Sequence, residues 1–269
     1  NFSYSIIEPS PYLSQRQKNR LSKMNSRLAD KIKWYSTCPD EGFLGVAIAN
    51  EVFDAMPARR FTIRRGEIKE LGVAYDGENF IWEIMECSVI PELILDRMAN
   101  YPEGYTTEHV ERQGRWFAEF KKFMKRGILL VADYGYVDQD FFHLDRCDGT
   151  LRCYFKHHSN DNPFFAVGLQ DITTSVNFSY LAECALSAGF TVDGFTSQAK
   201  FLMGNKLDDH IATLSAGDSV DAYRVAQEAK RLILPSQMGE SFKFMACSYR
   251  LEKKMSGVTD NERFRLGEK

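Results

Sequence analysis

Three features of specialised protein classes are missing from the 269 residues of this chain. No run approaches the ~20 apolar residues of a membrane-spanning helix, and the six cysteines form no C-x-x-C pair. Excess positive charge is missing too, because 34 lysines and arginines face 37 acidic residues, a formal net charge of −3. We therefore predict no membrane span, reduced cysteines and no nucleic-acid partner.

Motifs of several common chemistries are also missing. The sequence contains neither a G-x-S-x-G elbow nor a Gly-rich phosphate loop, which argues against serine hydrolase and P-loop activity. Cys147, Cys153, His157 and His158 lie close together, but their spacing, C-x5-C-x3-H-H, fits no common zinc pattern. We predict no metal site.

What is present is the composition of an ordinary globular protein, with 44% hydrophobic and 26% charged residues. Short apolar runs and helical periodicity predict strands at 4–7, 31–35, 43–49, 127–133, 190–195 and 241–250, and helices at 11–25, 52–55, 90–98, 107–126, 198–203 and 220–234. A further helix is expected to begin at Asp171, acting as its N-cap. Continuous apolar strands between helices predict an α/β fold with a parallel sheet buried on both faces.

Between 59 and 86 the pattern changes to short β segments separated by Arg65-Gly66 and Asp76-Gly77. An Asp-Gly pair between β-formers indicates a hairpin. We predict a core formed by 1–58 and 127–255, an inserted subdomain at 59–126 and a polar tail at 256–269. The chain begins with Asn1 inside an alternating apolar segment, so we interpret it as a fold entered midway, with N-terminal residues missing.

Acidic residues follow several predicted strands, where open α/β sheets bind their ligands. Glu8, directly after the first strand, is placed to accept hydrogen bonds from the two ribose hydroxyls of a nucleotide-like cofactor; the alternative is a solvated strand end. Asn50, Glu51 and Asp54 follow the third strand, although Asn50 is equally suited to capping a short helix. Asp133 and Tyr134 end another strand, and Tyr105 and Glu108 lie where they could fold over the same edge.

These landmarks form an ordered set that covers nearly the whole chain up to about Arg250. Its segments are Ile7-Glu8-Pro9-Ser10 with Leu13 and Gln17, Ala49 to Pro57, Gly127 to Tyr136, Gly149 to Tyr154 with His158, Gly168 to Thr173, Gln198 to Leu202 and Met238 to Lys243. The set resembles the MidA-type family of S-adenosylmethionine-dependent methyltransferases, which includes a mitochondrial protein arginine methyltransferase required for complex I assembly. The family's Gly-rich loop, which precedes the strand of Glu8, is not part of the sequence.

The resemblance implies a seven-stranded Rossmann-like methyltransferase fold whose parallel sheet ends in one reversed strand, formed here by 241–250. It implies S-adenosylmethionine as cofactor, contacted by Glu8, Pro9, Ser10, Ala49, Asn50 and Glu51. Glu51 is the leading catalytic candidate, followed by Asp54, Asp133 and Glu108. Tyr105, Tyr134, Asp171 and His158 are candidate substrate contacts, although Asp171 is more simply explained as a helix cap.

The function expected from the resemblance is methylation of arginine side chains in a protein substrate, such as a respiratory complex I subunit. The expected compartment is a bacterial cytoplasm or a mitochondrial matrix, and a homodimer is one option for the oligomeric state. Two other readings remain open: a non-catalytic assembly protein that keeps the fold, and a nicotinamide-dependent oxidoreductase. Binding of S-adenosylmethionine separates the enzyme from the first, and binding of NAD(H) tests the second.

Overall fold

The computed structural model describes residues 3–24, 31–86, 89–156, 158–215, 219–251, 255, 257–258 and 260–267. Its central sheet is built from β3 (Phe43–Asn50), β8 (Met124–Tyr136), β12 (Val176–Asn177), β13 (Thr191–Ser197) and β14 (Phe242–Tyr249). β3 and β12 run parallel to β8, whereas β14 runs antiparallel to both β8 and β13. The reversed strand predicted at 241–250 is therefore present, but it lies between β8 and β13 rather than at an edge. β1 (Tyr4–Ile7) and β2 (Ile32–Tyr35) form a separate parallel pair.

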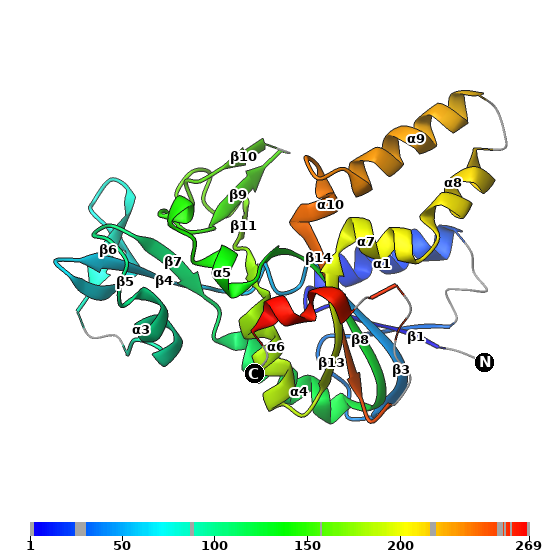
Figure 1. Cartoon of the computed structure of the whole chain (residues 1–269), viewed down its shortest axis with the longest axis horizontal. Coiled ribbons are helices and arrows are strands. Elements are labelled where there is room, and N and C mark those ends of the chain that lie inside the picture. Colours follow the sequence, from blue (N-terminus) through cyan, green and yellow to red (C-terminus); the bar gives the residue numbers. More distant parts are fainter. Residues whose placement is uncertain are drawn as a thin grey trace.

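Helices pack on both faces of the central sheet and extend beyond it (Figure 1). Met245 faces the helices on one side, and its neighbour Phe244 stacks on Phe201 of a helix on the other, with ring centroids 4.0 Å apart. The helices outside the segment 59–109 are α1 (Pro11–Met24), α4 (Arg112–Phe123), α6 (Phe178–Ser187), α7 (Gln198–Gly204), α8 (Leu207–Leu214), α9 (Ser219–Ile233) and α10 (Met238–Ser241). The short helical segments α5 (Asp138–Phe141), η1 (Leu144–Arg146) and η2 (Asp260–Leu266) belong to the same part of the chain. α8 and α9 form a helical hairpin that projects away from the sheet.

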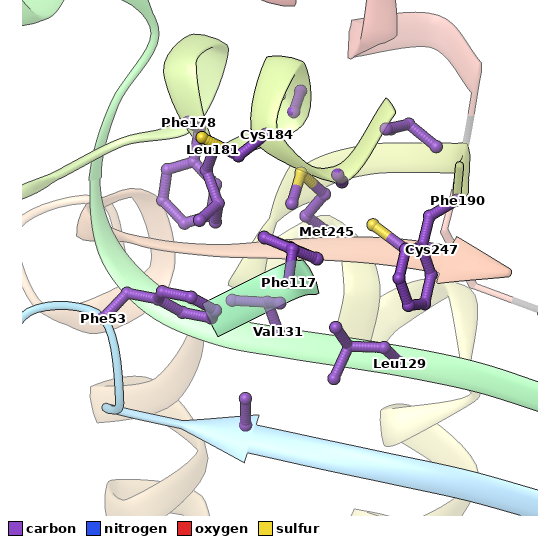
Figure 2. Packing of buried hydrophobic residues seen from close by; sticks show 14 of the residues in the cluster. Phe53, Phe117, Leu129, Val131, Phe178, Leu181, Cys184, Phe190, Met245 and Cys247 are labelled. Carbon is purple, nitrogen blue, oxygen red and sulfur yellow. The ribbon is translucent and has the colours of Figure 1, made fainter. Parts of the chain in front are cut away.

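The main hydrophobic core lies between the sheet and α4 and α6. Figure 2 shows Phe117 of α4 and Phe178 and Leu181 of α6 converging on Val131 of β8 and Met245 of β14. All five are fully buried. Burying a side chain of this size stabilises the fold by roughly 1.5–3 kcal/mol, so this layer fixes the positions of the strands whose ends carry the candidate site.

The segment 59–109 folds as a second, antiparallel sheet of order β6-β5-β4-β7. It consists of β4 (Arg59–Arg64), β5 (Glu67–Tyr75), β6 (Phe80–Met85) and β7 (Thr106–His109), with α3 (Glu92–Met98). The side chains of Phe61 and Ile63 pack with Ile94 and Met98 in a second hydrophobic cluster, which also includes Phe141 and Phe142 from the segment after β8. The hairpin predicted at Asp76-Gly77 is confirmed, because β5 and β6 pair around it.

A third, small sheet is formed by the part of the chain between β8 and β12 of the central sheet. β9 (Arg152–Phe155) lies in its centre, flanked by β10 (His158–Asn160) and β11 (Asp171–Thr173). In Figure 1 it lies above the second sheet, on the same side of the molecule.

Four local predictions were wrong. Residues 52–55 form turns rather than a helix, and Thr106–His109 is a strand, so that the helix predicted from 107 begins only at Arg112. That helix ends at Phe123, and Gly127 lies inside β8. Asp171 lies in β11 rather than capping a helix; the next helix begins at Phe178, where the Asn177 side chain accepts a hydrogen bond from the Tyr180 amide at 3.1 Å.

Burial of β3 also differs from the prediction. Leu44, Val46 and Ile48 are each more than 60% exposed, whereas Phe43 and Ala47 pack against the main core. An apolar run can belong to a strand with only one covered face, and periodicity alone does not distinguish this from burial on both faces. In the described part of the chain, β3 is covered on one face.

Two facing glycines permit the close approach of β3 and β8. Gly45 and Gly127 are register partners, and a Cβ on Gly127 would lie 1.9 Å from the Gly45 carbonyl oxygen. We expect Gly127→Ala to lower the free energy of unfolding by about 1–3 kcal/mol, because the strands must move apart. The measurement is urea denaturation. Gly114→Ala is the matched control, since its new Cβ meets only the Cys184 sulfur at 3.7 Å, and it should be neutral or stabilising by up to about 1 kcal/mol. Equal effects of the two substitutions would contradict the close-approach argument.

Candidate active site

The candidate site lies at the carboxyl end of β3, beside the last residues of β8. Asn50 is the register partner of Ala132, and the Glu51 amide donates to the Ala132 carbonyl at 2.9 Å. The two strands are parallel, so their carboxyl ends meet at one edge of the sheet. The polar residues at and after the end of β3, Asn50 to Asp54, are thereby brought beside Asp133 and Tyr134. These two residues lie within β8, which continues to Tyr136, and do not follow the strand as the sequence predicted.

Glu51 has a left-handed backbone conformation, with a φ of +50°. This conformation costs a residue other than glycine of order 1–3 kcal/mol, and it persists where the surrounding structure imposes it. The side chain is exposed, and the Asn50 amide donates to its Oε1 atom at 3.2 Å. The turn therefore presents a carboxylate to solvent in one orientation directly at the strand end.

Asp133 holds the turn after β3 in place. Its Oδ2 atom accepts hydrogen bonds from the amides of Phe53 at 3.0 Å and Asp54 at 3.3 Å, and its Oδ1 atom accepts from the Tyr134 amide at 2.9 Å. The side chain is fully buried. Burial, with the nearby Asp54 carboxyl as a second cause, raises the pKa of Asp133 to about 7, against the effect of the three amides.

Asp54 is buried beside Asp133, and its Oδ1 atom has no hydrogen-bond partner among the described residues. Burial raises the pKa of Asp54, the nearby Tyr134 hydroxyl lowers it, and the Glu51 carboxyl raises it again. Three carboxyl groups therefore share one strand edge. A cation placed between Glu51 and Asp54 would relieve their mutual repulsion and supply a donor to the orphaned oxygen.

The segment after β11 closes over this cluster. The Thr174 amide donates to the Asp54 carbonyl at 3.0 Å. Burial raises the pKa of Tyr134, and the nearby Thr173 hydroxyl lowers it. Neither threonine was among the predicted site residues, although Thr173 belongs to the segment that carried the family resemblance. The sequence alone does not indicate a role for these two threonines. They lie more than a hundred residues after Asp54 in the chain, and strand pairing brings them near it.

Glu8 lies at the end of β1 and borders a separate cleft of about 340 Å³. Its Oε1 atom accepts from the Ser10 amide and its Oε2 atom from the Gln17 side chain, each at 3.0 Å. The Trp34 indole in turn donates to the Gln17 oxygen at 3.0 Å. Gln17 and Trp34 were not among the predicted site residues; they hold the carboxylate in a single orientation, and each of its oxygens retains a lone pair.

Glu108 and Tyr105 lie inside the second sheet's region rather than at the strand ends of the core. Glu108 is buried on β7, where its Oε2 atom accepts from the Thr150 amide at 2.7 Å and its Oε1 atom faces the Arg60 guanidinium at 3.2 Å. Burial raises its pKa. Tyr105 is buried against Tyr101, with ring centroids 4.3 Å apart, and burial raises its pKa.

A chain of hydrogen bonds nevertheless links Glu108 to the site. The Thr150 hydroxyl that donates to Glu108 accepts a bond from the Ser175 amide at 3.1 Å. Ser175 follows Thr174, whose amide donates a hydrogen bond to the Asp54 carbonyl. Glu108 is thus placed to position the segment after β11, which contains Thr174 and Ser175. Asp171 and His158 are exposed on the small sheet, opposite Tyr154 and Phe155 respectively.

The described residues contain no group of three or more metal-ligating side chains; His157 lies outside them. In the same part of the chain, no helix is long and apolar enough to cross a membrane. Cys38, Cys147, Cys153 and Cys184 carry free thiols.

Comparison with known proteins identifies relatives of this chain. Residues 1–196 match a family model described as "putative S-adenosyl-L-methionine-dependent methyltransferase". The zebrafish (Danio rerio) protein named protein arginine methyltransferase NDUFAF7, mitochondrial, is 28% identical over 267 residues, covering 91% of this chain and 60% of that protein. The human protein of the same name is 26% identical, covering 80% and 48%.

Two solved structures from Burkholderia thailandensis have the same fold. An uncharacterized protein superposes with a TM-score of 0.88 at 31% identity, covering 96% of this chain and 69% of the other. A member of the same superfamily, solved bound to S-adenosyl-homocysteine, gives a TM-score of 0.83 at 32% identity, covering 96% and 65%. The chain spans about half to two thirds of the length of these relatives.

The raised pKa of Asp133 predicts a pH dependence of stability. Between about pH 4 and pH 7 the folded state holds a proton that the unfolded chain releases, so the free energy of unfolding falls as pH rises through this window. Asp133→Asn removes this contribution. We expect the stability difference between wild type and variant to shrink from pH 4 to pH 8 in urea titrations. A gap that stays constant would contradict the assignment; Phe117→Leu, a core substitution, should show such a constant gap.

Proposed function

Because the chain belongs to this family of S-adenosyl-L-methionine-dependent methyltransferases, we propose that it transfers methyl groups from S-adenosylmethionine to arginine side chains of a protein. The observation that carries the arginine assignment is the pair formed by Glu51 and Asp54. These carboxyls are near enough for one to raise the pKa of the other, and Asp54 keeps an orphaned oxygen. A guanidinium presents a planar fork of donors that matches two carboxylates.

We assign the ribose of the cofactor to Glu8. The free lone pair on each oxygen of this carboxylate suits a diol, and the adjoining cleft has the size of a small-molecule site. Pro9 and Ser10 continue the same turn, and Ala49, Asn50 and Glu51 are assigned to the side of the reactive methyl group. When bound, the cofactor supplies an electrophilic methyl group on a sulfonium.

The chain's own residues then act by position and charge. Glu51 and Asp54 would orient the guanidinium so that one nitrogen faces the methyl group, and hold it there; alignment of this kind lowers a barrier by several kcal/mol. The nitrogen must lose a proton as it is methylated, and the exposed Glu51 carboxylate is placed to accept it. Asp133, with a pKa of about 7, holds the turn rather than the substrate.

The names of the relatives support the same substrate class. The zebrafish and human relatives are both named as protein arginine methyltransferases and as mitochondrial. We assign the subdomain 59–126 to docking of the substrate protein, with Tyr105 and Glu108 supporting its shape, and Tyr134, Asp171 and His158 to the substrate side of the site. A respiratory complex I subunit as substrate, a matrix or bacterial cytoplasmic location and a homodimer stay predictions.

Glu51→Gln tests the catalytic assignment. The substitution removes the proton acceptor and the negative charge of Glu51 that would bind the guanidinium. We expect it to lower the rate of arginine methylation by about 10²–10⁴-fold, measured by mass spectrometry of a protein substrate. Glu41→Gln is the matched control, since Glu41 is exposed and precedes β3 where Glu51 follows it. Full methylation by the Glu51 variant would remove Glu51 from this role.

Glu8→Gln tests the cofactor assignment. The amide replaces one acceptor by a donor that faces either the Ser10 amide or the Gln17 side chain. We expect at least about tenfold weaker binding of S-adenosylmethionine in calorimetric titration, equivalent to about 1.4 kcal/mol. Asp40→Asn, an exposed substitution away from the cleft, should bind as the wild type does. Failure of the wild type itself to bind would favour the non-catalytic assembly protein.

A further inference from the structure

The β5–β6 hairpin ends the second sheet with an open edge. β6 pairs with β5 on one side, and no strand of the described chain pairs with its other side. The turn between the two strands is stabilised by the Asp76 carboxylate, which accepts hydrogen bonds from the amides of Glu78 at 2.9 Å and Asn79 at 2.8 Å. Figure 1 places the hairpin at the opposite end of the molecule from α8 and α9. An ordered, unpaired strand edge is a template for another extended segment.

Aromatic side chains line one face of this edge. Tyr75 and Phe80 are cross-strand partners with ring centroids 5.5 Å apart, and Trp82 is the next residue of β6 on their face. Phe164, from the loop between β10 and β11, packs against Phe80 at 6.5 Å and Trp82 at 5.2 Å. Tyr75 is 61% exposed and Phe80 44%. The strip is rigid, and it still offers apolar surface to a partner.

The hairpin is also acidic. Residues 67–86 contain six acidic side chains and one lysine. Glu70 is held by Arg59 and Glu67 by Lys69, at 2.7 Å and 2.6 Å. Glu78, Glu83 and Glu86 remain exposed along the turn and β6. A cationic segment would meet complementary charge here.

The same charges oppose the other obvious occupant, a second copy of this chain. Pairing β6 with the β6 of another molecule would bring Glu78 and Glu83 of both hairpins together. Charged residues on an edge strand are a common device against such self-association. The aromatic strip would favour any apolar partner, and the exposed carboxylates would favour a partner that is also positively charged.

We propose that the outer edge of β6, with Tyr75, Phe80, Glu78 and Glu83, docks an extended cationic segment of the substrate protein as an added strand. Main-chain hydrogen bonds would give affinity, and alternate side chains would meet the aromatic strip and the carboxylates. The inference rests on the proposed function, since a protein whose arginines are methylated brings cationic segments to the enzyme. The Glu108–Thr150–Ser175 hydrogen bonds lead from this sheet to Asp54.

The experiment measures binding of a fluorescein-labelled peptide, (Lys-Val)6, to the full chain by fluorescence anisotropy. Lysine replaces arginine so that the guanidinium specificity of the Glu51–Asp54 pair does not contribute. The test variant is the double substitution Glu78→Lys/Glu83→Lys. The matched control is Asp96→Lys, which changes an exposed residue of α3, the helix packed on the opposite face of the same sheet. A second peptide, (Lys-Pro)6, keeps the charge but lacks half of the backbone donors.

We expect the double variant to bind (Lys-Val)6 at least about tenfold more weakly and Asp96→Lys to bind as the wild type does. The wild type should bind (Lys-Pro)6 at least about tenfold more weakly than (Lys-Val)6. Equal binding by wild type and double variant would overturn the proposal, as would equal binding of the two peptides. So would a wild-type dimer in sedimentation that the double variant loses, because the edge would then hold a second copy. Intact peptide binding without arginine methylation would leave the docking surface standing and count against the proposed function alone.

Discussion

The candidate site depends on one carboxylate that is buried where a charge is costly. Asp133 lies in β8 just beyond the point where β3 ends, and its carboxylate accepts hydrogen bonds from the amides of Phe53 and Asp54 in the turn after β3. Turns that follow a strand leave backbone donors without a ladder partner, and a carboxylate is the side chain that can accept several at once. The same burial raises the pKa of Asp133 to about 7, so the group that shapes the turn is itself sensitive to pH near neutrality.

That turn fixes the two carboxyl groups that the proposed chemistry assigns to the guanidinium. It puts Glu51 in a left-handed conformation at the strand end, and it buries Asp54 with one oxygen unpartnered. Both features cost stability, and neither contributes to packing. Unfavourable local conformations and orphaned buried polar atoms concentrate at functional sites, where a ligand completes what the fold leaves open. A guanidinium fits this arrangement because it brings positive charge and hydrogen-bond donors together.

The second sheet is coupled to the site by buried polar contacts as well as by apolar packing. Phe61 and Ile94 pack in one cluster with Phe141 and Phe142, which follow β8 in the chain. Glu108 links β7 to Thr150 and so to the segment that closes over Asp54. A fully buried carboxylate needs its partners, since losing one leaves a charge without compensation. The subdomain is therefore held in a defined relation to the strand ends while keeping its own surface and its open edge at β6.

The local signals that predicted correctly were those whose cause lies within a few residues. The helical periodicity of 11–25, the Asp-Gly turn of the hairpin and the apolar run of β8 were each recognisable in isolation. The errors share a cause as well. Thr106–His109 has no strong strand pattern, and it is a strand because β4 pairs with it; Asp171 has the chemistry of a helix cap, but pairing with Tyr154 makes it part of β11.

The sequence by itself determined which residues follow the strands, and with them the family and the acidic character of the site. Strand ends are marked by a change from apolar to polar residues, a local property that burial imposes. Only the tertiary structure decided which of those residues meet. It joined Glu51, Asp54 and Asp133, added Thr173 and Thr174, and kept Tyr105 and Glu108 in the second sheet's region, because contacts between residues far apart in the chain are set by strand order and register, which no local pattern encodes.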